Sequence, residues 1–302
     1  MSFKKILLPV DGSSASPWIL DRIRRLLALP GLSVTILGVA PAAGDPVSAA
    51  DPRHKPMHDA IRGFKDRLLA EGVSAIGSIV FGDPAAEILR EAAVGAYDLI
   101  AMASHGRTGL DRILFGSVAL KILQAAPMPL LLARPLLKPD GSISSAERTD
   151  PARFQNILVP LDGSQTAEEI VPAVEKLARA MRSRLHLLTV VPGGSTESEH
   201  RRAAEAALLR WCRIFDSVGV EATPEVRAGE ASSEVLDCLQ QRGLDTIALT
   251  THGHTGLARA LYGSVAEKLL ARATVPILVC RSRLTHPPAL QVQATSLRLG
   301  IP

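Results

Sequence analysis

The chain has 302 residues, of which 47% are apolar and 3% aromatic, and its formal net charge is +4 at pH 7. This length predicts two domains, and the aliphatic composition favours helices packed on a parallel sheet. The composition excludes a surface of stacked aromatic rings for single-stranded nucleic acid. Since no run of five or six like charges occurs, we expect no nucleic-acid partner.

Cysteine usage and the apolar segments indicate a cytoplasmic protein. Cys212, Cys238 and Cys280 are widely spaced and no CxxC motif occurs, which favours free thiols in a reducing compartment. The first apolar run ends at Asp11, too early for a signal peptide, and the longest apolar stretch, residues 26–44, is interrupted by proline and glycine. We therefore expect no membrane partner.

The first half of the chain alternates short aliphatic runs with segments of helical periodicity. The runs predict strands at residues 5–10, 33–39, 74–80, 97–102 and 130–133. Helical periodicity predicts helices at 16–29, 84–94 and 117–124. A further helix is predicted between the second and third strands, through Ile61, Phe64, Leu68 and Leu69. This strict alternation predicts an α/β fold with a doubly wound, five-stranded parallel sheet flanked by helices.

The second half repeats the first. KILLPVDGS at 5–13 returns as NILVPLDGS at 156–164, GDPAAEIL at 82–89 as GEASSEVL at 229–236, and SHGRTGLDRILFGSVA at 104–119 as THGHTGLARALYGSVA at 251–266. The offset is 151 residues at the first block and 147 at the later ones, so the second copy loses four residues between them. Strands are predicted again, at 155–161, 185–191, 221–227, 245–249 and 277–279. A period this long indicates two tandem copies of one domain.

The repeat also sets the domain boundaries. The two copies occupy residues 1–134 and 153–283, and residues 135–152, which contain proline, glycine, serine and charged residues, form a linker. Residues 284–302 have no partner in the first copy. They form a tail that is either poorly ordered or an arm over the surface.

Two repeated segments follow the first and the fourth strand of each copy. In doubly wound sheets, ligands bind past the carboxyl ends of the strands, where the strand order reverses. The glycines of the second segment let backbone N–H groups approach an anion, and the helix that opens at Ser117 or Ser264 favours negative charge. The alternative is that these two serines only cap their helices.

These segments resemble those of the universal stress proteins that bind ATP. That family carries G-x2-G-x9-G-(S/T) after its fourth strand; Gly106, nine residues and Gly116-Ser117 match the second part, as do Gly253, nine residues and Gly263-Ser264. The sequences VDGS and LDGS after the first strands resemble the family's first-strand motif. The resemblance covers residues 1–134 and 153–283, and it implies two Rossmann-like domains of the adenine nucleotide alpha hydrolase type.

The resemblance also implies a nucleotide site in each copy. It implies ATP as the ligand, with Mg²⁺ left open, an adenine pocket around Val39 and Val190, and a role for Asp11 and Asp162 near ribose or metal. For His105 and His252, contact with phosphate and bonding to the loop backbone are both open. In the first copy the implied residues are Pro9, Val10, Asp11, Gly12, Ser13, Val39, Ala103, Ser104, His105, Gly106, Arg107, Gly109, Gly116, Ser117 and Val118. In the second they are Pro160, Leu161, Asp162, Gly163, Ser164, Val190, Thr250, Thr251, His252, Gly253, His254, Gly256, Gly263, Ser264 and Val265.

Two residues depart from the family pattern. Its first glycine is replaced by Ala103 in the first copy and by Thr250 in the second. If that position requires a left-handed backbone, the conformational strain is greater for β-branched threonine than for alanine. We therefore expect the first copy to bind nucleotide more tightly. The alternative is that Thr250 lies in an ordinary strand and its hydroxyl helps to hold the ligand.

The expected function is that of an ATP-binding regulator in the stress response. The alternative is a stress or assembly module that binds no nucleotide and acts through protein partners. Without a Walker lysine or an evident catalytic base, the sequence predicts no fast phosphoryl transfer, and slow ATP hydrolysis is left open. The two copies are expected to pair through their apolar last strands as an intramolecular pseudo-dimer, and a further homodimer of the full chain is left open.

Overall fold

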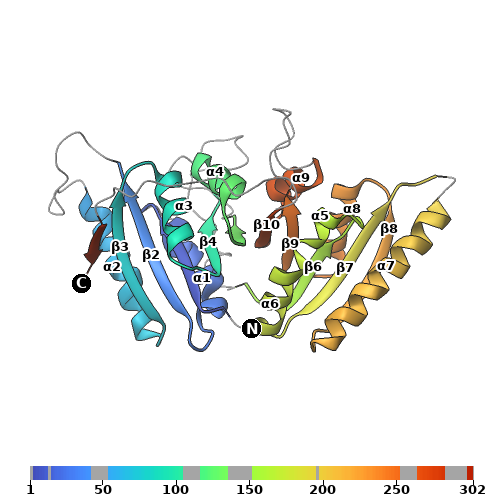
Figure 1. The fold of residues 1–302 in the computed structure, drawn as a ribbon, viewed down its shortest axis with the longest axis horizontal. Coiled ribbons are helices and arrows are strands. Elements are labelled where there is room, and N and C mark those ends of the chain that lie inside the picture. The colour runs from blue at the N-terminus through green and yellow to red at the C-terminus, as the bar shows by residue number, and fades with distance from the viewer. Residues whose placement is uncertain are drawn as a thin grey trace. The chain divides into compact units, whose positions relative to one another are not determined.

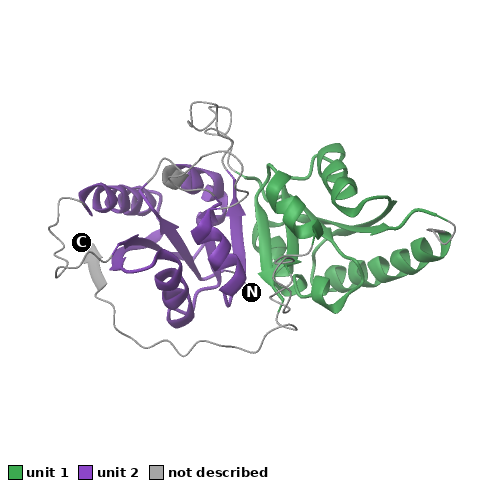
Figure 2. Ribbon diagram, turned by 90° about the horizontal axis from the view of Figure 1, so that it is seen from above, with its two compact units in different colours: residues 1–2, 152–287 green, residues 3–151, 288–302 purple. Residues whose placement is uncertain are grey.

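The computed structural model describes residues 3–12, 15–41, 54–104, 116–134, 152–194, 197–251, 264–282 and 298–301 (Figure 1). The chain divides into two compact units, which we name by their place in the sequence (Figure 2). The N-terminal domain comprises residues 3–151 with 288–302, and the C-terminal domain comprises residues 152–287 with 1–2. Of the predicted linker, residues 135–151 lie outside the described part of the chain.

The N-terminal domain is built on a parallel sheet whose strand order is β3-β2-β1-β4-β5. Its strands are β1 (Lys5–Val10), β2 (Ser33–Ala40), β3 (Ser74–Phe81), β4 (Leu99–Ala103) and β5 (Leu130–Ala133). The order reverses at β1, which lies between β2 and β4, so the sheet is doubly wound as predicted.

Four helices connect these strands: α1 (Ala15–Leu27), α2 (Lys55–Ala70), α3 (Pro84–Val94) and α4 (Ser117–Ala125). Figure 1 shows α3 and α4 in front of the sheet and α2 behind it. Ile61, Phe64 and Leu68 of α2 are buried against the sheet. Leu69, the fourth apolar residue through which this helix was predicted, is 49% exposed.

The C-terminal domain repeats this architecture with the order β10-β9-β6-β7-β8, again parallel throughout. Its strands are β6 (Asn156–Pro160), β7 (Arg184–Val191), β8 (Ala222–Ala228), β9 (Thr246–Thr251) and β10 (Ile277–Arg281). Its helices are α5 (Gln165–Glu168), α6 (Val171–Met181), α7 (Glu197–Ser217), α8 (Ala231–Gln241) and α9 (Ser264–Arg272). The order reverses between β6 and β9, which is where the sequence places the ligand.

The end of the tail adds a strand that the sequence does not predict. Residues Arg298–Ile301 form β11, which pairs antiparallel with β3, so the N-terminal sheet is no longer purely parallel. The edge strand β3 reads SAIGSIVF, without charge or proline, and such an edge needs a cover. The equivalent edge strand β8 carries Pro224, Glu225 and Arg227, residues that discourage pairing.

No helix in the described part of the chain is both long enough and apolar enough to cross a membrane.

Candidate functional site

The turn that follows β6 is held by its own polar groups. The Asp162 carboxylate accepts a hydrogen bond from the Ser164 backbone N–H at 2.9 Å, and the Ser164 hydroxyl caps α5 by accepting from Ala167 N–H at 3.1 Å. Between them, Gly163 has φ = 82°, a left-handed conformation that glycine adopts without strain. Gly12 occupies the equivalent place in the N-terminal domain with φ = 73°. Both Asp-Gly-Ser motifs therefore place glycine where the turn requires it.

A pocket of about 250 Å³ lies at the point where the strand order of the C-terminal domain reverses. It is enclosed by the carboxyl ends of β6, β7 and β9 and by the starts of α8 and α9. The structure brings together eight of the predicted residues here: Pro160, Leu161, Asp162, Ser164, Val190, Thr250, Ser264 and Val265. The repeat motifs of the C-terminal copy thus converge on one cavity.

The pocket has further walls that the sequence analysis did not assign to a site. Apolar side chains of α8, α9 and the strands contribute most of them: Leu188, Ala231, Val235, Leu249, Ala266 and Leu269, with Thr166 and Ala167 from α5. Ala231 and Val235 belong to the repeated block GEASSEVL, so the repeat itself was the signal that could have identified them.

Ser264 opens α9 and Ser117 opens α4, and both residues are exposed. The N-cap of α4 is Gly116, with no side-chain cap hydrogen bond, so Ser117 is not the capping residue. The Gly116 N–H donates to the Ser104 carbonyl at 2.9 Å, so these two residues, which flank the segment 105–115 in the sequence, lie in contact. The exposed Ser117 hydroxyl at a helix N-terminus is suited to an anionic ligand.

The expectation that Ala103 and Thr250 replace a glycine with a left-handed backbone is wrong. Ala103 ends β4 in register with Ala133, Thr250 lies within β9 in register with Cys280, and neither has a positive φ. The Thr250 hydroxyl donates to the Ala167 carbonyl at 3.4 Å and its side chain lines the pocket. Because both residues adopt ordinary strand geometry, replacing glycine at this position costs no backbone strain.

The other predicted residues divide into two groups. Those of the N-terminal domain within the described part of the chain lie at the carboxyl ends of β1, β2 and β4 or at the start of α4: Pro9, Val10, Asp11, Gly12, Val39, Ala103, Ser104, Gly116, Ser117 and Val118. In the C-terminal domain Thr251 ends β9 and is buried. Outside the described residues lie Ser13, His105, Gly106, Arg107, Gly109, His252, Gly253, His254, Gly256 and Gly263.

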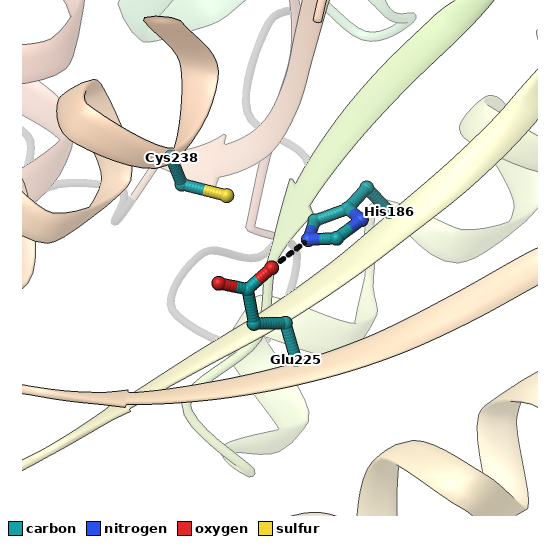
Figure 3. Close-up of side chains that lie close together, drawn as sticks. All are labelled: His186, Glu225 and Cys238. Atoms are coloured by element: carbon teal, nitrogen blue, oxygen red, sulfur yellow. Dashed lines mark hydrogen bonds and ion pairs between the residues drawn. The ribbon is translucent and has the colours of Figure 1, made fainter. Parts of the chain in front are cut away.

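A separate polar cluster joins β7, β8 and α8 (Figure 3). Atoms of His186, Glu225 and Cys238 lie within 4.8 Å of one another, and the His186 ring contacts the Glu225 carboxylate at 2.7 Å. The same carboxylate also holds Arg227 at 2.6 Å and Arg242 at 3.0 Å. A metal ion here would lie beside two guanidinium groups, and burial raises the pKa of the Cys238 thiol to about 11. The cluster is better explained as an ionic network that fastens the edge strand β8.

This network predicts a pH-dependent loss of stability. Burial raises the pKa of Glu225, but the hydrogen bonds from Arg227 and His186 and the charges of Arg227 and Arg242 together outweigh it, so this pKa lies below its ordinary value. Its carboxylate therefore stabilises the fold above the unfolded-state pKa, and this contribution is lost as pH falls through the lower folded-state pKa. Glu225→Gln should cost about 1–3 kcal/mol at pH 7, since a partly buried charged acceptor is lost.

The measurement is urea unfolding of both proteins between pH 3 and pH 8. The difference between wild type and Glu225→Gln should be full at neutral pH and shrink below the ordinary glutamate pKa of 4.5. A difference that stays constant across this range would contradict the role given to the carboxylate. Glu221→Gln is the matched control, because Glu221 pairs with Arg184 at the exposed surface, where ion pairs contribute little.

Comparison with known proteins identifies the chain's relatives. The family model described as "Universal stress protein family" matches residues 2–134 and again 153–281. Universal stress protein MJ0531 of Methanocaldococcus jannaschii is 29% identical over 151 residues, which cover 46% of this chain and 89% of that protein. Universal stress protein YxiE of Bacillus subtilis is 29% identical over 147 residues, covering 44% of this chain and 99% of that protein.

The fold has a matching solved structure. A universal stress protein from Archaeoglobus fulgidus superposes with a TM-score of 0.68, covering 93% of this chain and 99% of that one. The identity is 22%, so this likeness concerns the fold. Since the family model accounts for both copies of the repeat, the chain belongs to the universal stress protein family and carries two of its domains in tandem.

Proposed function

We propose that this member of a stress-response family is a regulator that binds an adenine nucleotide, ATP, at the carboxyl edge of the C-terminal sheet. The observation that carries the proposal is the pocket at the strand-order reversal, where eight of the predicted site residues meet. Open α/β sheets bind their ligands at this point, because two neighbouring connections leave it in opposite directions.

The pocket's lining suits a molecule with an apolar ring and a polar, anionic end. Leu188, Val235 and Leu249 offer aliphatic walls for a base. The lining also includes the Ser264 hydroxyl at the first turn of α9, where backbone N–H groups and the helix dipole favour phosphate. The Asp162 carboxylate, within the Asp-Gly-Ser turn, lines the same pocket and suits a ribose hydroxyl or a phosphate-bound Mg²⁺.

The same lining supports binding rather than fast hydrolysis. No lysine or arginine is among the described residues that enclose the pocket, and the Asp162 carboxylate already accepts the Ser164 N–H at one of its oxygens. Rapid phosphoryl transfer needs a positioned nucleophile and cations on the transferred group. We therefore propose a binding role in which occupancy changes the protein's conformation or its partners.

Pairing of the two copies through β5 and β10 remains a prediction from the sequence, as does any homodimer of the full chain.

The proposal predicts that ATP stabilises the protein against heat. Ligand at a hundredfold excess over its Kd adds about 2.7 kcal/mol per site. For a domain of this size, that raises Tm by roughly 5–10 °C, at about 2–4 °C per kcal/mol. The measurement is differential scanning calorimetry with millimolar ATP and Mg²⁺ on protein shown by mass spectrometry to be nucleotide-free. An unchanged Tm would favour the alternative of a module that acts without nucleotide.

A further inference from the structure

The C-terminal domain has a second pocket, on the side of the sheet covered by α7. Its volume is about 300 Å³, and α7 contributes Ala203, Ala204, Ala207 and Trp211 to its walls. It shares Leu161, Asp162 and Val190 with the pocket at the strand-order reversal, so the two pockets meet over the end of β6. Ligand pockets usually measure about 300–1,000 Å³, so a nucleotide would need space from both.

The helices α2 and α7 are structural equivalents whose residues correspond one to one. Gly72 follows α2 with φ = 78°, and Gly219 follows α7 with φ = 75°. The next residue of each domain, Val73 or Val220, donates its N–H five residues back, to Leu68 O at 2.9 Å and to Phe215 O at 3.0 Å. The two helix ends therefore have the same backbone geometry at the offset of 147 residues.

Counting back along the uninterrupted helices pairs Met57 with Ala204 and Phe64 with Trp211. Ala204 and Trp211 both line the second pocket, so Met57 occupies the corresponding place in the N-terminal domain. The four residues that the second copy lacks are lost before α7 begins and do not disturb this correspondence.

Met57 fills that place. A Cβ added to Gly38 would lie 2.6 Å from Met57 Sδ and 3.0 Å from Met57 Cγ, so the thioether packs directly on the end of β2. A Cβ added to Gly12 would lie 3.8 Å from Met57 Cα, so the same residue also borders the turn after β1. In the C-terminal domain the residue at the position of Gly38 is Thr189, whose hydroxyl donates to Leu161 O at 2.8 Å. The Thr189 side chain takes the part of that space next to the strand, and Ala204, which has only a methyl group, lines the second pocket.

We infer that Met57 and Ala204 determine which domain accepts nucleotide, so that the chain binds one nucleotide, in the C-terminal domain. This inference rests on the proposed function. It adds the number of nucleotides bound per chain and the position, Met57 or Ala204, that determines this number. The sequence predicts that the N-terminal domain binds nucleotide more tightly, and this inference reverses that order. That prediction assumes backbone strain at Thr250, but Ala103 and Thr250 both adopt ordinary strand geometry.

The test is isothermal titration calorimetry of the full chain with ATP and Mg²⁺. Wild type should bind one nucleotide, and Ala204→Met should weaken that binding about tenfold or more, equivalent to about 1.4 kcal/mol. Ala206→Met is the matched control, since Ala206 is exposed on the same helix and does not line the pocket, and its affinity should equal that of wild type. Met57→Ala should add a second binding event.

The outcomes separate this inference from the proposed function. Two nucleotides bound by wild type, or unchanged affinity in Ala204→Met, would overturn the inference while leaving the proposed function intact. Absence of binding by wild type would overturn the proposed function and the inference with it. Because Met57→Ala removes packing between α2 and β2, where Met57 is partly buried, the decisive comparison is between the two alanine-to-methionine variants of α7, with their Tm values measured to show that both are folded.

Discussion

Truncation of Phe215 to alanine should lower the Tm of the C-terminal domain by about 6–20 °C. Phe215 is fully buried near the end of α7, and its ring centroid lies 6.2 Å from that of Trp211. Phenylalanine-to-alanine changes in a core cost about 3–5 kcal/mol, because transfer energy is lost and a cavity remains. For a domain of this size, each kcal/mol corresponds to about 2–4 °C. Since α7 forms one wall of the second pocket, the change should also weaken ATP binding.

The chain offers both a probe and a control for this experiment. Trp18 lies in α1 and Trp211 in α7, so fluorescence in a Trp18→Phe background reports the C-terminal domain alone. Leu209→Ala changes a residue of the same helix that is 46% exposed, and its effect should stay within about 0.5 kcal/mol. Equal losses of stability in Phe215→Ala and Leu209→Ala would contradict the packing assigned to α7.

The second large effect is expected at the turn after β6. Gly163→Val should destabilise the domain by about 1–2 kcal/mol, because a side chain at positive φ meets the neighbouring backbone. It should also weaken ATP binding strongly, since relief of this strain moves Asp162 and Ser164, which line the pocket. Thermal melts and calorimetry of the same preparation separate the two effects.

Gly219→Val is the matched control for that variant. Gly219 has φ = 75° against 82° for Gly163, and beyond the two adjacent residues of the chain an added Cβ at either position meets nothing within 4 Å. The two variants should therefore lose similar stability, while only Gly163→Val loses affinity. Similar affinities in both would show that the turn does not contribute to the site.

The architecture was predictable because its signals are local or repeated. Short runs of three to seven residues, most of them aliphatic, marked each of the parallel strands β1 to β10, and the boundaries of β1, α3 and β5 agree with the structure residue for residue. Duplication then strengthened each assignment, since Asp-Gly-Ser and Gly-Ser recur at equal places in both copies. Helix ends were less accurate: α1 stops at Leu27, two residues before the predicted end.

Other features depend on contacts between distant residues, which the sequence pattern does not encode. Whether Thr250 needed a left-handed backbone was decided by its pairing with Cys280 in the sheet. The strand β11 pairs with β3, an edge strand more than two hundred residues earlier in the chain.

By itself, the sequence determined that this protein has two copies of one α/β domain and that the ends of the first and fourth strands carry the candidate site. Periodicity is a property of neighbouring residues and repetition is a property of the duplication, so both can be recognised from the sequence alone. Only the tertiary structure decided that α8 lines one pocket, that α7 lines a second, and that Met57 packs on Gly38 at the equivalent place in the N-terminal domain. The physical reason is that the volume left between packed elements depends on which side chains meet across them, and here methionine in place of alanine fills it.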